Sequence, residues 1–149
     1  MPVSSSKSKV RFFFEQKGFS LENRRALKHF IETIFVKEKK RLSAINYIFC
    51  SDKRVLEINR QFLNHDYFTD IITFDLSESR SIEAEVYISI DRVRENARLL
   101  NISFKSELHR VIFHGVLHLC GYKDKKPADI KKMRGKESIY LNKYGIGQV

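Results

Sequence analysis

Two histidines one helical turn apart are the strongest chemical signal in the sequence. His114 and His118 lie in a segment with helical character, so their imidazoles leave the same face and can bind one metal ion. Gly121 stands where a helix end needs a positive φ angle, and the chain can then turn back to offer Asp124 as a third ligand. Three protein ligands with a fourth position open to water are typical of a catalytic zinc site. The pattern therefore predicts one metal ion per chain, Zn²⁺ or another divalent cation.

Gly115 and Cys120 limit which kind of metal site the two histidines can form. The spacing is also typical of zinc proteases with the motif HExxHxxGxxH, but Gly115 stands where their general base is a glutamate, and glycine cannot take a proton. Cys120 follows His114 by six residues, which places it about 240° further round the helix, so we expect it in the core. For each histidine the alternative is a core imidazole with a satisfied hydrogen bond.

Two charged residues precede the histidines on roughly the same helix face. Glu107, two turns before His114, is a candidate general base or a residue that orients a ligand. Its alternative is a solvated glutamate stabilised in the first helical turn. Arg110, one turn before His114, is a candidate phosphate contact, and the alternative is a solvent-facing or ion-paired arginine.

Net charge indicates the class of partner. The 149 residues include 28 Lys and Arg against 18 Asp and Glu, a net charge of +10, which predicts a polyanionic partner: nucleic acid or an anionic membrane. The last 28 residues alone carry +5, beside Asp124, and their helix lacks the long apolar face of a membrane binder. The longest uncharged stretch, residues 111–122, is shorter than the ~20 residues of a membrane span, and residues 1–9 do not resemble a secretory signal. We therefore expect a cytoplasmic protein that binds nucleic acid.

The expected elements place these residues in one α+β domain spanning residues 1–149. Apolar periodicity and capping residues predict four strands and five helices, with N-caps at Ser51-Asp52 for the second helix and at Asp91 for the third. The strands are expected at residues 10–15, 44–50, 69–74 and 85–90, and the helices at 21–40, 51–63, 91–100, 103–119 and 127–143. We expect a mixed four-stranded sheet packed with about five helices, a flexible tail at 1–9, and free buried thiols at Cys50 and Cys120. Helix 103–119 should be the most buried, with the metal site at its end.

Three ordered segments resemble the YbeY family of bacterial endoribonucleases. The segment from His114 to Tyr122 is similar to the family signature HGxLHLxGYDH. Residues 58–74 resemble LNxxYRxKDxPTDVLSF, and residues 84–89 resemble GDIxIS. The resemblance implies a single-domain, metal-dependent endoribonuclease that cuts single-stranded RNA in rRNA maturation and ribosome quality control, with RNA and the ribosome as partners.

The sequence departs from the family motifs at two functional positions. Asp124 stands where the family has its third histidine ligand, and oxygen is an ordinary zinc ligand. Leu63 stands where the family has an arginine thought to act on the RNA phosphate. His65 and Arg60 are candidates to replace that charge, and the alternative for each is an ordinary exposed side chain.

The resulting hypothesis is a hydrolase in which water bound to a zinc ion attacks a phosphodiester. Basic side chains would hold the RNA, and Tyr67 and Tyr122 are candidates to stack on unpaired bases, with half-buried core residues as the alternative. The competing hypothesis is a non-catalytic, ribosome-associated RNA-binding factor whose metal site only stabilises the fold. Leu63 makes this alternative credible, because leucine can neither carry charge nor donate a hydrogen bond.

Overall fold

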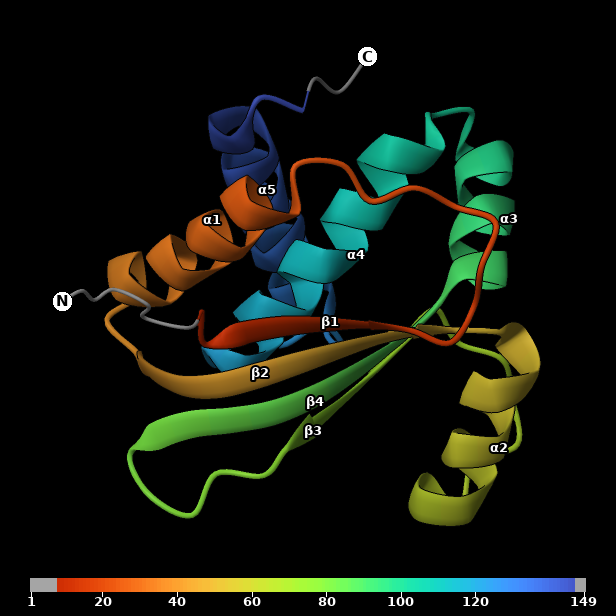
Figure 1. The fold of residues 1–149 in the computed structure, drawn as a ribbon, viewed down its shortest axis with the longest axis horizontal. Helices are drawn as coiled ribbons and strands as arrows, with labels where there is room; N and C mark the ends of the chain where they lie inside the picture. Colours follow the sequence, from red (N-terminus) through yellow and green to blue (C-terminus); the bar gives the residue numbers. More distant parts are fainter. Residues whose placement is uncertain (1–7, 147–149) are drawn as a thin grey trace, which may run out of the picture.

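A four-stranded mixed sheet carries the fold in the computed structural model, which describes residues 8–146 (Figure 1). The strand order is β1-β2-β4-β3, in which β1, β2 and β4 run parallel and β3 is antiparallel to β4. The strands are β1 (Val10–Phe14), β2 (Arg41–Cys50), β3 (Ile71–Asp75) and β4 (Ser81–Ser89). The helices are α1 (Arg24–Lys37), α2 (Asp52–Leu63), α3 (Ile90–Leu100), α4 (Phe104–Leu119) and α5 (Pro127–Tyr144). The predicted single α+β domain with a mixed four-stranded sheet and five helices is confirmed.

Alternation along β2 divides the apolar residues between the two faces of the sheet. Tyr47 and Phe49 belong to the main core, whereas Ile48 and Cys50 belong to a smaller cluster with residues of α2. In Figure 1, α1, α4 and α5 lie on one side of the sheet and α2 lies on the other. Nine of the sixteen residues of α4 are buried, which confirms the prediction that this helix is the most deeply packed.

Two helix N-termini test the predicted caps. Ser51 caps α2 as predicted, because its side chain accepts a backbone N–H of the first turn. The predicted cap at Asp91 is wrong. Ser89 caps α3 instead, since the helix begins one residue earlier at Ile90. The carboxylate of Asp91 accepts the backbone N–H of Asp52 at 2.8 Å and so joins the starts of α2 and α3.

The ends of other elements differ from the prediction by a few residues. β4 begins at Ser81 because it pairs with β2 along its length. The helix α1 is shorter than predicted at both ends, where Asn23 and Lys39 have φ angles of 53° and 61°. Of the expected tail, residues 1–7 lie outside the described residues, while the hydroxyl of Ser8 donates to Glu32 at 2.7 Å. Both cysteines are buried and free, as predicted. Within residues 8–146, no helix is long and apolar enough to cross a membrane.

Candidate active site

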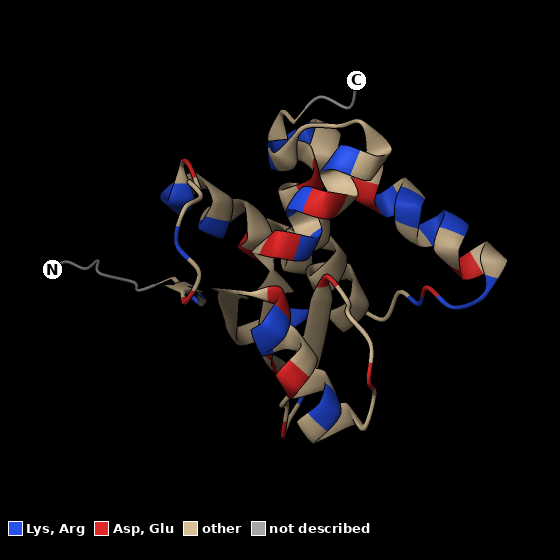
Figure 2. Ribbon diagram, turned by 90° about the vertical axis from the view of Figure 1, so that its right-hand side faces the viewer, with Lys and Arg blue, Asp and Glu red and all other residues tan. Residues whose placement is uncertain are grey.

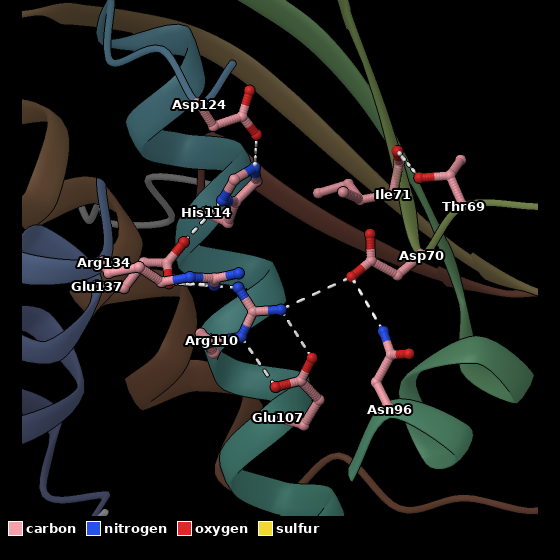
Figure 3. Close-up of polar contacts among 10 residues, drawn as sticks. All are labelled: Thr69, Asp70, Ile71, Asn96, Glu107, Arg110, His114, Asp124, Arg134 and Glu137. Carbon is pink, nitrogen blue, oxygen red and sulfur yellow. Dashed lines mark hydrogen bonds and ion pairs between the residues drawn. The ribbon is translucent and has the colours of Figure 1, made fainter. Parts of the chain in front are cut away.

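The helix α4 is held close to the sheet at the point where it presents the first histidine. Gly115 makes this approach possible: a Cβ atom at this position would lie 3.1 Å from Cδ1 of Ile71 on β3. The helix ends at Leu119 with Cys120 as its C-cap, and Gly121 follows with a φ of 105°, which confirms the predicted turn. The chain then returns toward α4 and brings Asp124 back to His114 (Figure 3).

Two of the three predicted ligands are in direct contact. Nε2 of His114 lies 3.1 Å from Oδ2 of Asp124. The ring of His118 is nearly parallel to that of His114, with 6.1 Å between the ring centroids, and its side chain is exposed. All three side chains line one cavity of about 430 Å³, which we call the active-site cavity. Among residues 8–146, no three His, Cys, Asp or Glu side chains already stand as a complete metal site.

The donor atoms fit a zinc ion in type, and the first pair fits it in spacing. Two ligands at the usual 2.0–2.2 Å from a tetrahedral ion are about 3.3–3.5 Å apart, close to the 3.1 Å between His114 and Asp124. His118 is exposed, so its imidazole can turn without disturbing the core. Two imidazoles and one carboxylate are a ligand set that zinc accepts.

A buried glutamate from α5 fixes the other nitrogen of His114. Oε2 of Glu137 lies 2.7 Å from Nδ1 of His114, and the Glu137 side chain is only 1% exposed. A metal-binding histidine usually donates its second nitrogen to such a carboxylate, which leaves the first nitrogen free to bind. Glu137 therefore orients His114 toward Asp124 and the cavity (Figure 3).

Arg110 connects this pair to two further carboxylates. It donates two hydrogen bonds to Glu107, at 2.7 and 2.8 Å, and one to Glu137 at 3.2 Å. Its guanidinium also lies 3.7 Å from Asp70, which stands just before β3. Carboxylates on three separate segments thus share one arginine. Because Arg110 is already paired, little of its positive charge is available to a ligand.

The surroundings shift the pKa values of these groups in opposite directions. Burial opposes ionisation of Glu137, but the hydrogen bond from His114 and the charges of Arg110 and Arg134 hold its pKa below the usual range. At Asp70, burial is the stronger influence and raises the pKa, although Arg110 and His114 act against it. Arg110 stays protonated, because its carboxylate partners raise its pKa against the effect of burial.

Of the predicted catalytic residues Glu107, Arg110 and His65, the last two line the active-site cavity and the first does not. Glu107 is fully buried, so the alternative of a solvated glutamate is wrong; it contacts Arg110 and does not line the cavity. Arg110 lines the cavity and is ion-paired, one of the two alternatives left open for it. His65 also lines the cavity, and its exposed ring stacks on Tyr67 with centroids 5.1 Å apart. The catalytic roles of these residues stay predictions.

Four further residues named from the sequence are divided between the cavity and other surfaces. Leu63 and Tyr67 line the active-site cavity, so the position of the expected arginine is occupied there by an apolar side chain. Arg60 pairs with Asp66 and does not line the cavity. Tyr122 does not line this cavity. It is half-buried, and Nζ of Lys136 lies 5.7 Å from its ring centroid.

Sequence reasoning missed the residues that α5 contributes. Glu137 orients His114, and Arg134 lines the cavity with its side chain 57% exposed while it donates to Glu137 at 2.9 Å. A signal for Glu137 was present: it lies between Met133 and Tyr140 on the buried stripe of the helix, where a charged residue needs a partner. Arg134 had no comparable signal within a helix rich in exposed cations.

Comparison with known proteins decides the family. The family model described as endoribonuclease YbeY matches residues 9–145. The chain belongs to the YbeY family. The endoribonuclease YbeY of Cytophaga hutchinsonii is 49% identical over 89% of this chain and 94% of its own, and that of Flavobacterium johnsoniae is 42% identical over 93% and 99%. A YbeY-like fold is also found in the solution structure of a Thermotoga maritima protein, with a TM-score of 0.63, 32% identity, and coverage of 91% of this chain and 88% of that one.

Proposed function

We propose that this protein is a metal-dependent endoribonuclease that cleaves single-stranded RNA, and that it acts on rRNA precursors in ribosome maturation and quality control in the cytoplasm. Its membership of the YbeY family supports the reaction class. The observation that carries the proposal is the position of His114, whose Nε2 faces Asp124 at 3.1 Å while Glu137 occupies Nδ1 at 2.7 Å. An imidazole held in this way, in a cavity rather than in the core, is arranged to bind a metal ion.

The metal ligands in this proposal are His114, His118 and Asp124, and zinc is the ion that their chemistry favours. When bound, the ion supplies an activated water and neutralises charge on the phosphodiester. The residues of the chain orient and bind. Glu137 keeps the proton of His114 on Nδ1.

The cations of the cavity are suited to hold the RNA phosphates. Arg134 and Lys125 line the cavity and are exposed to solvent, whereas Arg110 is satisfied by its carboxylates. Tyr67 and His65 form an exposed stacked pair at the cavity edge, on which an unpaired base can continue the stack. The substrate this arrangement favours is a flexible single strand whose phosphate reaches His114.

The alternative is an RNA-binding factor without catalysis, and Leu63 in the cavity wall favours it. Cleavage of a labelled single-stranded RNA by zinc-loaded protein separates the two, with His114→Ala as the matched control. We expect the wild type to cleave and the variant to lose activity by at least about 100-fold, as for removal of a metal ligand. An intact RNA in both reactions, or equal cleavage in both, would show that the protein is not the enzyme.

A further inference from the structure

A second cavity lies on the other side of the loop that carries Asp124. It has a volume of about 540 Å³, and we call it the lysine cavity. Its polar lining consists of Glu38, Tyr122, Lys123, Lys126, Asp129 and Lys132. One loop contributes to both cavities: its middle residues Asp124 and Lys125 line the active-site cavity, and the flanking residues Lys123 and Lys126 line the lysine cavity. The two cavities therefore meet at residues 123–126 of this loop.

The three lysines of the lysine cavity are free to bind an anion. Lys123, Lys126 and Lys132 are exposed, and within residues 8–146 none of them is ion-paired with a carboxylate. Figure 2 shows Lys and Arg residues following one another along α5 and the loop before it. The loop and the first turns of α5 thus present a row of unpaired positive charges.

The two acids of the lysine cavity do not neutralise this row. Glu38 is already engaged: it accepts hydrogen bonds from Tyr122 at 2.8 Å and from Lys136 at 3.3 Å, and a third from Tyr140. These contacts hold its pKa below the usual value although burial opposes them. Asp129 lies in the first turn of α5, where the helix N-terminus partly offsets its charge.

Positive charge also continues beyond the cavity. Lys37 lies beside Lys143 and lowers the pKa of its ammonium group, and Lys136 adds to the same effect. Like charges remain this close only at a cost, which an anionic ligand along the surface would relieve. The positively charged surface therefore extends beyond the lysine cavity to Lys37 and Lys143.

We propose that the lysine cavity binds backbone phosphates of the same RNA strand that enters the active-site cavity, with Lys126 and Lys132 as the principal contacts. The strand crosses the loop at residues 123–126, so one stretch of nucleotides engages both cavities. This inference rests on the proposed function in assuming that the strand is RNA. Lysine is suited to such a site, because it contacts phosphate as a point charge and does not read the base.

The test uses two double variants. The cavity variant carries Lys126→Ala and Lys132→Ala, and the control variant carries Lys17→Ala and Lys53→Ala. The control removes the same charge from exposed lysines that line neither cavity. The side chain of Lys126 makes no capping hydrogen bond to α5, so its loss should leave the helix intact. Equal melting temperatures of the two variants check this.

Binding is measured by fluorescence anisotropy over a range of salt concentrations, with the metal-loaded full chain and an RNA of about twelve nucleotides. Phosphorothioate linkages keep the charge and resist hydrolysis. Each lost phosphate contact lowers the slope of log K against log salt by about 0.7 for a single strand, so we expect a decrease of about 1.4 in the cavity variant. The affinity at low salt should fall by roughly 10-fold, while the control stays near wild type.

Cleavage supplies a second readout. Wild type should prefer the long RNA over a dinucleotide in kcat/KM, and this preference should shrink for the cavity variant and persist for the control. Equal salt slopes for the two variants would overturn the inference. It would also be overturned if the cavity variant lost binding to phosphatidylserine vesicles but kept wild-type binding to RNA. A wild type that binds RNA through these lysines without cleaving it would overturn the proposed enzyme and leave the second site standing.

Discussion

Replacement of Glu137 by glutamine tests the geometry around His114 most directly. Oε2 of Glu137 meets Nδ1 of His114, while Oε1 accepts from Arg110 and Arg134 at 3.2 and 2.9 Å. A glutamine keeps only one oxygen. If this oxygen stays on the two arginines, the new NH2 group points at Nδ1, which must then accept a hydrogen bond. The ring proton moves to Nε2, and that nitrogen loses the lone pair that a metal ion needs.

The size of the effect follows from this change of tautomer. Loss of the carboxylate behind a metal-binding histidine costs 10–100-fold in metal affinity, or about 1.4–2.7 kcal/mol. We expect Glu137→Gln near the upper end, because the amide also favours the wrong tautomer. The metal-free variant should also lose about 1.5–3 kcal/mol in the free energy of unfolding, since a buried charged acceptor is lost.

The assay is a zinc titration in competition with a chromophoric chelator, and Glu107→Gln is the matched control. Glu107 is equally buried and bonds to the same Arg110, but it does not touch His114. Glu107→Gln should therefore destabilise the fold to a similar degree and keep its zinc affinity. Wild-type affinity in Glu137→Gln, or an equal loss in both variants, would refute the reasoning.

Three further predictions concern groups around the site and the core. Arg134→Ala should raise KM for RNA by about 3–10-fold with little change in kcat, and Arg134→Lys should recover part of the loss, because the exposed guanidinium binds phosphate; an unchanged KM would contradict this. Burial raises the pKa of Cys50 and Cys120 to about 12, so neither thiol should react quickly with Ellman's reagent at about pH 8 unless urea is added. Glu38→Gln should lower the free energy of unfolding by about 1–3 kcal/mol near pH 7. The folded pKa of Glu38 is lowered from 4.5, so its contribution to stability is present above pH 4.5 and is lost as the pH falls through the lowered folded pKa. Urea unfolding near pH 3 should therefore show a smaller difference between Glu38→Gln and wild type than near pH 7.

Features fixed by neighbouring residues could be predicted from the sequence. Gly121 ends α4 in a left-handed conformation because its backbone permits it, and Asp124 returns to His114 because only two residues separate it from that turn. The prediction of Asp91 as the cap of α3 is wrong because Ser89 is an equally good capping residue. Pairing of β4 with β2 extends to Ser89, and this pairing decides where the strand ends and the helix begins. Local chemistry therefore predicts the contact between His114 and Asp124 but not every element boundary.

Contacts between distant segments were out of reach of this reasoning. Glu137 meets His114 across 23 residues, and the position depends on how α5 packs on α4. The burial of Glu107 depends on Arg110, which neutralises it on the same helix and allows a first-turn glutamate to leave the solvent. Spacing places Glu107 on the same face as Arg110, but only the packed structure shows that it is buried and bonded to that arginine.

The charged residues of the site form two regions, an acidic interior around His114 and a basic rim on the loop before α5 and on α5 itself. Glu107, Glu137 and Asp70 surround Arg110, so the interior around His114 carries more negative than positive charge, which suits a cation. Arg134 lies at the rim, and further cations follow on the loop and α5, where an RNA strand can be attracted without displacing the buried pairs. Leu63 supplies no charge to the cavity, whereas Lys125 and Arg134 line the same cavity and supply cations to it. Substitutions on the exposed face of α5 should therefore change KM, and substitutions of residues that contact His114 should change metal affinity and kcat.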